Sequence, residues 1–123
     1  MKITTVGIDL AKNVFQVHGG DERGKAVLRK SLKRAEVAKF FATIESCLVG
    51  MEACGSAHNW AWKPIELGHS VKLMAPQFVN PYVKTNKNDT RDAEAICEAV
   101  ARPNMRFVPV KTADSAPAIP GAA

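Results

Sequence analysis

The stretch VGIDLA at residues 6–11 places a carboxylate, Asp9, at the end of an apolar run. Val and Ile side chains favour a buried β-strand. Burying an unpaired carboxylate costs several kcal/mol, so an acid that ends a core strand usually lies at its solvated end beside a partner. We therefore predict that Asp9 ends a core strand and is stabilised by a cap, a base or a metal ion.

Outward from this strand, the hydrophobic pattern alternates between two periods. Apolar runs of β-prone residues predict strands at residues 3–9, 13–18, 25–30, 46–52 and 69–76. Apolar residues at helical spacing predict helices at residues 34–44, between Ser56 and Gly68, and at 89–102. This order predicts an α/β fold with a mixed sheet, in which a three-stranded antiparallel meander is followed by parallel strands with flanking helices.

Several segments are less regular. The glycines of HGGDERGK, residues 18–25, predict a hairpin turn. Pro64 removes a backbone hydrogen bond, so we expect it to kink the second helix or to end it before Trp62. The stretch RFVPV at residues 106–110 predicts a short strand, and the Ala- and Pro-rich tail is expected to be disordered.

The composition is that of one globular domain with a basic surface. The 123 residues carry a formal net charge of +5, and residues 23–39 hold seven Lys and Arg side chains against one acid, Glu36. Such clustering fits a phosphate-binding surface, and a solvated strand edge and helix face explains it equally well.

The cysteines, histidines and apolar stretches argue against a disulfide framework, a zinc site and a membrane span. The three cysteines form no CxxC pair, and the three histidines show no zinc-type spacing, so each histidine is expected at the surface or half-buried. No signal peptide is visible, and no stretch approaches the ~20 apolar residues that a membrane span needs. We therefore predict a cytoplasmic protein, associated with the nucleoid when bound to DNA, and no membrane partner.

Four acidic residues form the candidate site. Asp9 and Glu52 end the first and fourth predicted strands, and Asp89 and Asp92 open the last helix. If the first and fourth strands are adjacent and parallel, their carboxyl ends bring Asp9 and Glu52 together at the edge of the sheet where α/β proteins bind ligands. Asp89 and Asp92 are three residues apart and so share a helix face. Each acid alone has a structural explanation, such as helix capping by Asp89. Together, three elements that deliver carboxylates to one edge predict a metal site.

The predicted metal is magnesium. Clustered carboxylates repel one another unless protons or cations bridge them, and Mg²⁺, with Mn²⁺ as a substitute, suits oxygen ligands in phosphate chemistry. Two such ions about 4 Å apart activate a nucleophile and stabilise the leaving oxygen in phosphodiester cleavage. The candidate chemistry is therefore cleavage of a nucleic-acid strand.

Four motifs in one order give a resemblance to a known family. They are VGIDLAKNVFQVH, GMEACGSAHNWA, VKLMAPQFVNPYVKTNKNDTRDAEAICEAV and RPNMRFVPVKT, and the match as a whole spans about residues 3–112. In these motifs the chain resembles the N-terminal domain of the DEDD-type insertion-sequence transposases, relatives of the Piv DNA invertase. That domain is similar to the Holliday-junction resolvase RuvC, within the ribonuclease H-like fold. The resemblance implies this fold and a role in DNA transposition and recombination.

The resemblance also implies site residues and partners. The family's four acidic residues, which bind divalent metal and support DNA strand cleavage, correspond to Asp9, Glu52, Asp89 and Asp92. The candidate contacts to nucleic-acid phosphates are Lys12, Lys84, Lys87 and Arg91. A solvated loop explains Lys84 and Lys87 about as well. Family members are described as working with a structured guide RNA, so the implied partners are DNA, a guide RNA and further copies of the chain in a dimer or larger homo-oligomer.

The chain also departs from the family pattern. Complete members continue through a helical linker into a C-terminal domain with a serine thought to attack DNA, and no serine of this chain lies in a matching motif. We therefore assign no nucleophile and expect a truncated transposase. Its enzyme domain would occupy residues 1–112, followed by a divergent tail at 113–123.

Two other functions stay open at this point. A catalytically silent fragment could act as a nucleic-acid-binding or subunit-interaction module, which a salt-dependent gel shift without cleavage would indicate. A phosphotransfer enzyme of the actin and sugar-kinase type has a similar first strand. Here, however, Ala11 and Lys12 replace the glycine and the small residue that let the backbone of its phosphate loop approach the phosphate, and the chain is too short for a second lobe.

Overall fold

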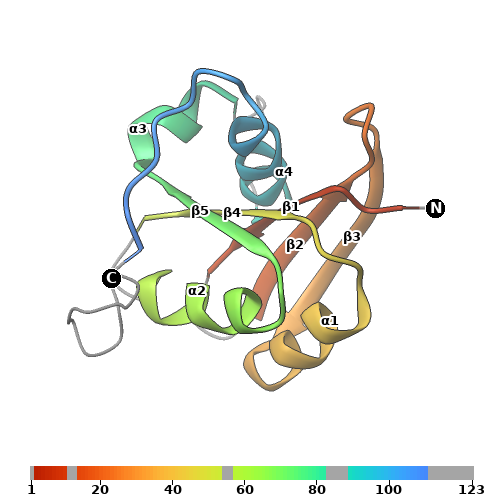
Figure 1. Ribbon diagram of the computed structural model, residues 1–123. Helices are drawn as coiled ribbons and strands as arrows, with labels where there is room; N and C mark the ends of the chain where they lie inside the picture. Colours follow the sequence, from red (N-terminus) through yellow and green to blue (C-terminus); the bar gives the residue numbers. More distant parts are fainter. Residues whose placement is uncertain (1, 11–13, 54–56, 83–88, 111–123) are drawn as a thin grey trace.

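A computed structural model of the chain describes residues 2–10, 14–53, 57–82 and 89–110, with the backbone alone described for residues 89–92. Its centre is a five-stranded mixed sheet in the order β3-β2-β1-β4-β5 (Figure 1). The strands are β1 (Thr5–Asp9), β2 (Val14–Gly20), β3 (Ala26–Lys33), β4 (Leu48–Glu52) and β5 (Ser70–Met74). The helices are α1 (Val37–Thr43), α2 (Ala57–Glu66), α3 (Pro76–Val79) and α4 (Asp89–Val100).

The strand pairing follows the predicted topology. The first three strands form an antiparallel meander, whereas β4 pairs parallel with β1 and β5 pairs parallel with β4. A parallel neighbour needs a crossover, and α1 and α2 provide the helices that lead into β4 and β5. The prediction of a meander followed by parallel strands is therefore confirmed.

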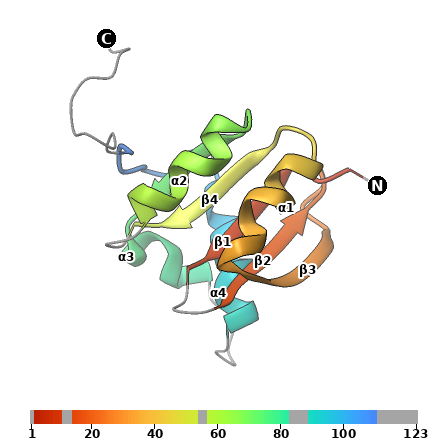
Figure 2. The same ribbon diagram turned by 90° about the horizontal axis from the view of Figure 1, so that it is seen from below.

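The sheet lies between two helical layers. Helices α1 and α2 cover one face, and α4 and the short α3 lie on the other (Figures 1 and 2). The α1 and α2 side holds the larger core, to which β2 contributes Phe15 and Val17. The α4 side holds a second cluster, which includes Ile96 and Val100. Alternating side chains let each strand supply both cores.

The hairpin between β2 and β3 differs in detail from the prediction. Gly19 and Gly20 belong to β2, and only Gly24 in this segment has a positive φ, of 83°. The carboxylate of Asp21 accepts hydrogen bonds from the backbone N–H groups of Arg23 and Lys25, each at 2.9 Å. These bonds hold the pKa of Asp21 below its usual value, the bond from Lys25 contributing most.

The prediction for Pro64 as an early end of the second helix is wrong. Helix α2 continues to Glu66, and Pro64 is fully buried. Its carbonyl oxygen accepts hydrogen bonds from the backbone N–H groups of Leu67 and His69 at 3.1 and 2.9 Å. Gly68, with a φ of 95°, then ends the helix as predicted. Burial of the proline ring and these bonds offset the one backbone bond that Pro64 cannot make.

The remaining segments divide between confirmation and correction. The helix between residues 34 and 44 begins with a 3-10 turn (Arg34–Glu36) before α1. The predicted strand at residues 106–110 is reduced to one antiparallel bridge between Val108 and Leu73. The segment after β5, expected as a plain connection, contains α3 and a 3-10 turn (Asn80–Tyr82). The predicted N-cap Ser56 and the tail at 113–123 lie outside the described residues.

Two histidines are core residues, contrary to the surface or half-buried positions expected for them. His69 accepts a hydrogen bond from the Cys47 backbone N–H at Nδ1 (3.1 Å), so its Nε2–H donates to the Phe41 carbonyl oxygen at 2.7 Å. His69 thereby ties α1 to the start of β4. His18 lies in β2 under α4, and its Nδ1 has no hydrogen-bond partner among the described residues. In the part of the chain that the structure describes, no helix has both the length and the apolar character to cross a membrane.

Candidate metal centre at the carboxyl edge of the sheet

Asp9 and Glu52 lie side by side at one edge of the sheet. The parallel register pairs Gly7 with Gly50 and Ile8 with Met51, so the next residues along β1 and β4 are the two acids. Neighbouring strands are about 4.8 Å apart, and both acidic residues are half-buried. The structure thus places these two predicted site residues together, at the ends of adjacent parallel strands.

Both acids face the α4 side of the sheet. Side chains two residues apart on a strand share a face, so Asp9 shares the face of Gly7, and Glu52 that of Gly50. A Cβ on residue 7 would meet backbone atoms of Ala93 and Cys97, and a Cβ on residue 50 would lie 2.7 Å from the Cβ of Val100. Two glycines therefore let α4 pack directly on the sheet beside the acids.

The direction of α4 brings its first turn to the same edge. The Sγ of Cys97 lies 3.6 Å from the carbonyl oxygen of Thr5, at the start of β1, while Ala93 lies over Gly7. Helix α4 therefore runs antiparallel to β1, and its N-terminal turn lies toward Asp9. That turn contains Asp89 and Asp92, whose side chains are outside the described part of the structure.

Three elements therefore converge on the edge, as the sequence predicts, but only two of the four acidic side chains are described. Within the described side chains, no three His, Cys, Asp or Glu groups gather closely enough to hold a metal ion. The predicted set needs Asp89 and Asp92 as well. Of the predicted phosphate contacts, Lys12, Lys84 and Lys87 lie outside the described residues, and Arg91 lies in α4 with only its backbone described.

Two buried thiols lie toward the amino ends of the strands, away from the acids, because the Cys97 Sγ is close to Thr5 of β1 and Cys47 directly precedes β4. Burial raises the pKa of the Cys97 thiol to about 12 and that of the Cys47 thiol to about 11, so both stay protonated at neutral pH. A protonated thiol is a poor metal ligand, because the thiolate is the coordinating form.

The sequence analysis missed Gly7 and Gly50, the two residues that determine how closely α4 approaches. The signal was present, because both strands carry the same order of residues: Val, Gly, an apolar residue and an acid, in VGID and VGME. In a strand, this order places the glycine and the acid on one face and the two apolar side chains on the other.

Comparisons with known proteins agree with this architecture. A family model for the DEDD transposases of the IS110 type, described as a transposase, matches residues 6–116. A Pseudomonas aeruginosa protein named "Probable family 20 transposase" is 60% identical over 114 residues, which are 93% of this chain and 34% of the relative. The transposase for insertion sequence element IS1328 of Yersinia enterocolitica is 51% identical over 112 residues, 91% of this chain and 34% of the relative. The chain therefore spans about a third of the length of these relatives.

Among solved structures, T. thermophilus RuvC in complex with a Holliday junction substrate has the same fold. The TM-score is 0.58 at 12% sequence identity, and the match covers 80% of this chain and 92% of RuvC. The predicted RuvC-type, ribonuclease H-like fold is therefore confirmed. With the match of the family model over residues 6–116, this chain belongs to the DEDD transposases of the IS110 type.

Proposed function

We propose that this chain is the metal-binding and strand-cleaving domain of its transposase, with Asp9, Glu52, Asp89 and Asp92 as the ligands of Mg²⁺ or Mn²⁺. The observation that carries the proposal is the convergence at one edge. Asp9 and Glu52 end adjacent parallel strands on the face that α4 covers, and the first turn of α4 lies toward them. If α4 served only to cover the sheet, acidic residues would be needed neither at the strand ends nor in the first turn of the helix.

The donor set fits a hard divalent ion. Carboxylate oxygens are the ligands that Mg²⁺ and Mn²⁺ prefer. Two carboxylates on neighbouring strands repel each other when both are ionised, and a cation between them removes this cost. Because Asp9 and Glu52 are half-buried, charges interact more strongly there than in water, which increases both the repulsion between the carboxylates and the stabilisation that a cation provides.

When bound, divalent ions supply charge that activates a water or hydroxyl and stabilises the leaving oxygen of a phosphodiester. The residues of the chain hold the reacting groups in place. Gly7 and Gly50 fix the distance between α4 and the sheet, which sets how far the first turn of α4 lies from Asp9. The rigid strand ends keep Asp9 and Glu52 in register.

The substrate and partners belong to the same proposal. DNA is the substrate that fits a domain whose relatives are transposases of insertion sequence elements. Lys12, Lys84, Lys87 and Arg91 are proposed to contact its phosphates, since they flank the proposed ligands in sequence. A structured guide RNA and a homo-oligomer follow from the family resemblance alone. The limits of the domain, residues 1–112, also stay a prediction.

Calorimetric titration of the full chain with Mn²⁺ tests the metal site. Asp9→Asn and Glu52→Gln each remove one ligand charge, and we expect each to weaken Mn²⁺ binding by more than about tenfold, because even the loss of a residue behind the ligands costs about 10- to 100-fold. Glu45→Gln is the matched control. Glu45 is exposed and lies before the amino end of β4, beside Lys2 at 3.6 Å and away from the proposed edge.

Cleavage of a labelled branched DNA in Mg²⁺ or Mn²⁺ tests the proposed strand-cleaving activity. Equal Mn²⁺ affinities in the wild-type protein, Asp9→Asn and Glu52→Gln would refute the metal site. Retained Mn²⁺ binding with salt-dependent DNA binding, but without cleavage at any metal concentration, would instead identify the chain as a silent binding module.

A further inference from the structure

A row of polar side chains continues from the two acids across the sheet. The register pairs Asp9 with Gln16 of β2 and Gln16 with Ser31 of β3, so Glu52, Asp9, Gln16 and Ser31 lie in one line over four strands. Residues directly opposite each other share a face, so the whole row faces the α4 side. Ser31 donates a hydrogen bond from its Oγ to the Gln16 Oε1 at 2.9 Å, which holds these two side chains together.

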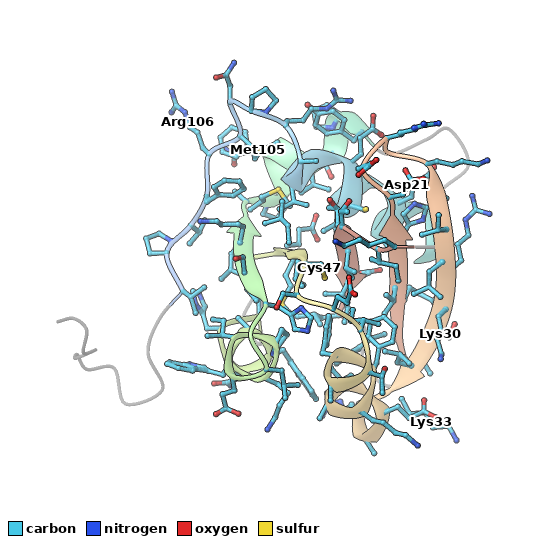
Figure 3. All side chains as sticks on the ribbon, turned by 45° about the vertical axis from the view of Figure 1, so that its right-hand side comes forward. Asp21, Lys30, Lys33, Cys47, Met105 and Arg106 are labelled. Atoms are coloured by element: carbon cyan, nitrogen blue, oxygen red, sulfur yellow. The ribbon has the colours of Figure 1, made fainter. Side chains whose placement is uncertain are left out.

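The outer end of this row is open to solvent and basic. Arg29 pairs with His18 and Lys33 pairs with Val14, so both face the same side as Ser31, one on either side of it along β3. All three are exposed. Figure 3 shows Lys33 at the end of β3 that is remote from the hairpin containing Asp21. We call Arg29, Ser31 and Lys33 of β3, together with the neighbouring Gln16 of β2, the β3 strip.

The positive charges of the β3 strip have no described counter-charge. Among the residues that the structure describes, the ion pairs are Lys2 with Glu45, Lys63 with Glu66, and Arg102 with Glu98, and none involves the strip. Glu36, the one acid in the basic stretch, uses its carboxylate to accept a 2.7 Å hydrogen bond from the Lys33 backbone N–H. An Arg and a Lys on the edge strand of a sheet that form no ion pair with a described residue suit an anionic ligand.

We propose that the β3 strip binds the phosphate backbone of the DNA strand that is presented to the carboxylate edge. This rests on the function proposed above. Two strand spacings, about 10 Å, separate β3 from β1, so a strand that reaches Asp9 can lie across Ser31 without a change in the fold. Arg29 and Lys33 supply charge, Gln16 and Ser31 supply neutral hydrogen-bonding groups, and none of them reads a base. The strip therefore positions the strand without selecting its sequence.

The opposite face of the same strand provides a matched control. Lys30 is exposed in β3 but faces α1, with its Nζ 5.9 Å from the ring centre of Phe40. Lys39 is exposed on α1. Arg29→Gln with Lys33→Gln and Lys30→Gln with Lys39→Gln therefore remove the same net charge from opposite faces. All four side chains are exposed, so we expect both double variants to fold.

Fluorescence anisotropy of a labelled single-stranded DNA, with EDTA present, tests the proposal. The logarithm of the DNA-binding constant falls linearly with the logarithm of the salt concentration. The loss of two phosphate contacts makes this negative slope shallower by about 1.4. We expect this loss in Arg29→Gln with Lys33→Gln, and a change less than half as large in the control pair. An RNA of the same sequence is titrated in parallel, and we expect the strip variant to weaken DNA binding at least as much as RNA binding.

Equal slopes in the two double variants would overturn the proposal, as would a loss confined to RNA. Because no metal is present, this result is independent of the Mn²⁺ titration. A protein that binds Mn²⁺ normally but shows no strip effect would refute only the DNA path. A strip effect in a protein that binds no Mn²⁺ would refute only the metal site.

Discussion

Helix α4 packs directly on Gly7 of β1, and Gly7→Ala tests whether this close approach is required. A Cβ on residue 7 would lie 2.7 Å from the Cα of Cys97, and nearer still to the Cys97 nitrogen and the Ala93 carbonyl oxygen. These are backbone atoms of a helix, so they cannot rotate away as the end of a side chain can. The added methyl group must therefore push α4 and β1 apart.

The structure sets the size of this effect. Ordinary contacts of a Cβ begin at 3.4 Å, so the 2.7 Å contact with the Cys97 Cα alone requires a shift of about 0.7 Å, and the two nearer backbone atoms require a larger one. Overpacking a core costs about 1–3 kcal/mol, and we expect the upper end, about 3 kcal/mol, because backbone rather than side chain must move. The same shift would carry the first turn of α4 away from Asp9, and a 1 Å misplacement can cost about 100-fold in catalysis.

Urea unfolding measures the stability change, and Gly20→Ala is the matched control. Gly20 is also buried in the sheet, but the nearest atoms to its added Cβ are the Lys25 carbonyl oxygen at 3.6 Å and the Cys97 Sγ at 3.7 Å. These are ordinary contacts, so Gly20→Ala should change the free energy of unfolding by less than about 1 kcal/mol. Mn²⁺ titration of both variants, at a temperature where both are folded, measures the effect on the proposed metal site.

Two results would refute this reasoning. The first is a Gly7→Ala variant as stable as the wild-type protein, which would mean that α4 does not rest on β1 as described. The second is equal destabilisation by Gly20→Ala, which would mean that the loss reflects replacing any strand glycine. Weakened Mn²⁺ binding in Gly7→Ala alone would support the role of α4 in placing the proposed ligands.

The two buried histidines give further predictions. Burial lowers the pKa of His18 from 6.5, so the unfolded chain binds a proton that the folded chain does not, and stability should fall as pH drops below about 6.5. Urea unfolding at pH 7.5 and 5.5 measures the free energy of unfolding that is lost at the lower pH. This loss should be smaller in His18→Gln than in the wild-type protein, and an identical loss would contradict the prediction. His69→Ala leaves the Cys47 N–H and the Phe41 carbonyl without partners, which should cost about 2–6 kcal/mol. A loss below about 1 kcal/mol in urea unfolding would show that water or a shift of the backbone replaces both bonds.

Much of the fold was predictable because it depends on local periodicity. Phe15 and Val17 are buried on one side of β2, and Ala93, Ile96 and Val100 are buried along α4, as alternation and helical spacing require. The pairing of Asp9 and Glu52 at one edge was expected on the condition that the first and fourth strands are adjacent and parallel, and the structure meets this condition with β1 and β4.

The errors concern contacts between residues far apart in the chain. The burial of His69 depends on hydrogen bonds to residues 22 and 28 positions away, which no local pattern contains. Pro64 stays inside α2 because its ring is buried in the tertiary structure, although it has no backbone N–H to donate to the helix. In both cases tertiary packing outweighs the local preference of one residue.

The repeated order in VGID and VGME connects packing to the proposed chemistry. In each strand the Val and the Ile or Met are almost fully buried toward α1 and α2, which anchors the strand in the larger core. The Gly of each strand faces the other way and admits α4, and the acid two residues later stands on that same face where the strand ends. In both strands the acid stands one side-chain repeat beyond the glycine. This placement means that the element that covers the sheet also delivers its first turn, with Asp89 and Asp92, to the edge where Asp9 and Glu52 lie.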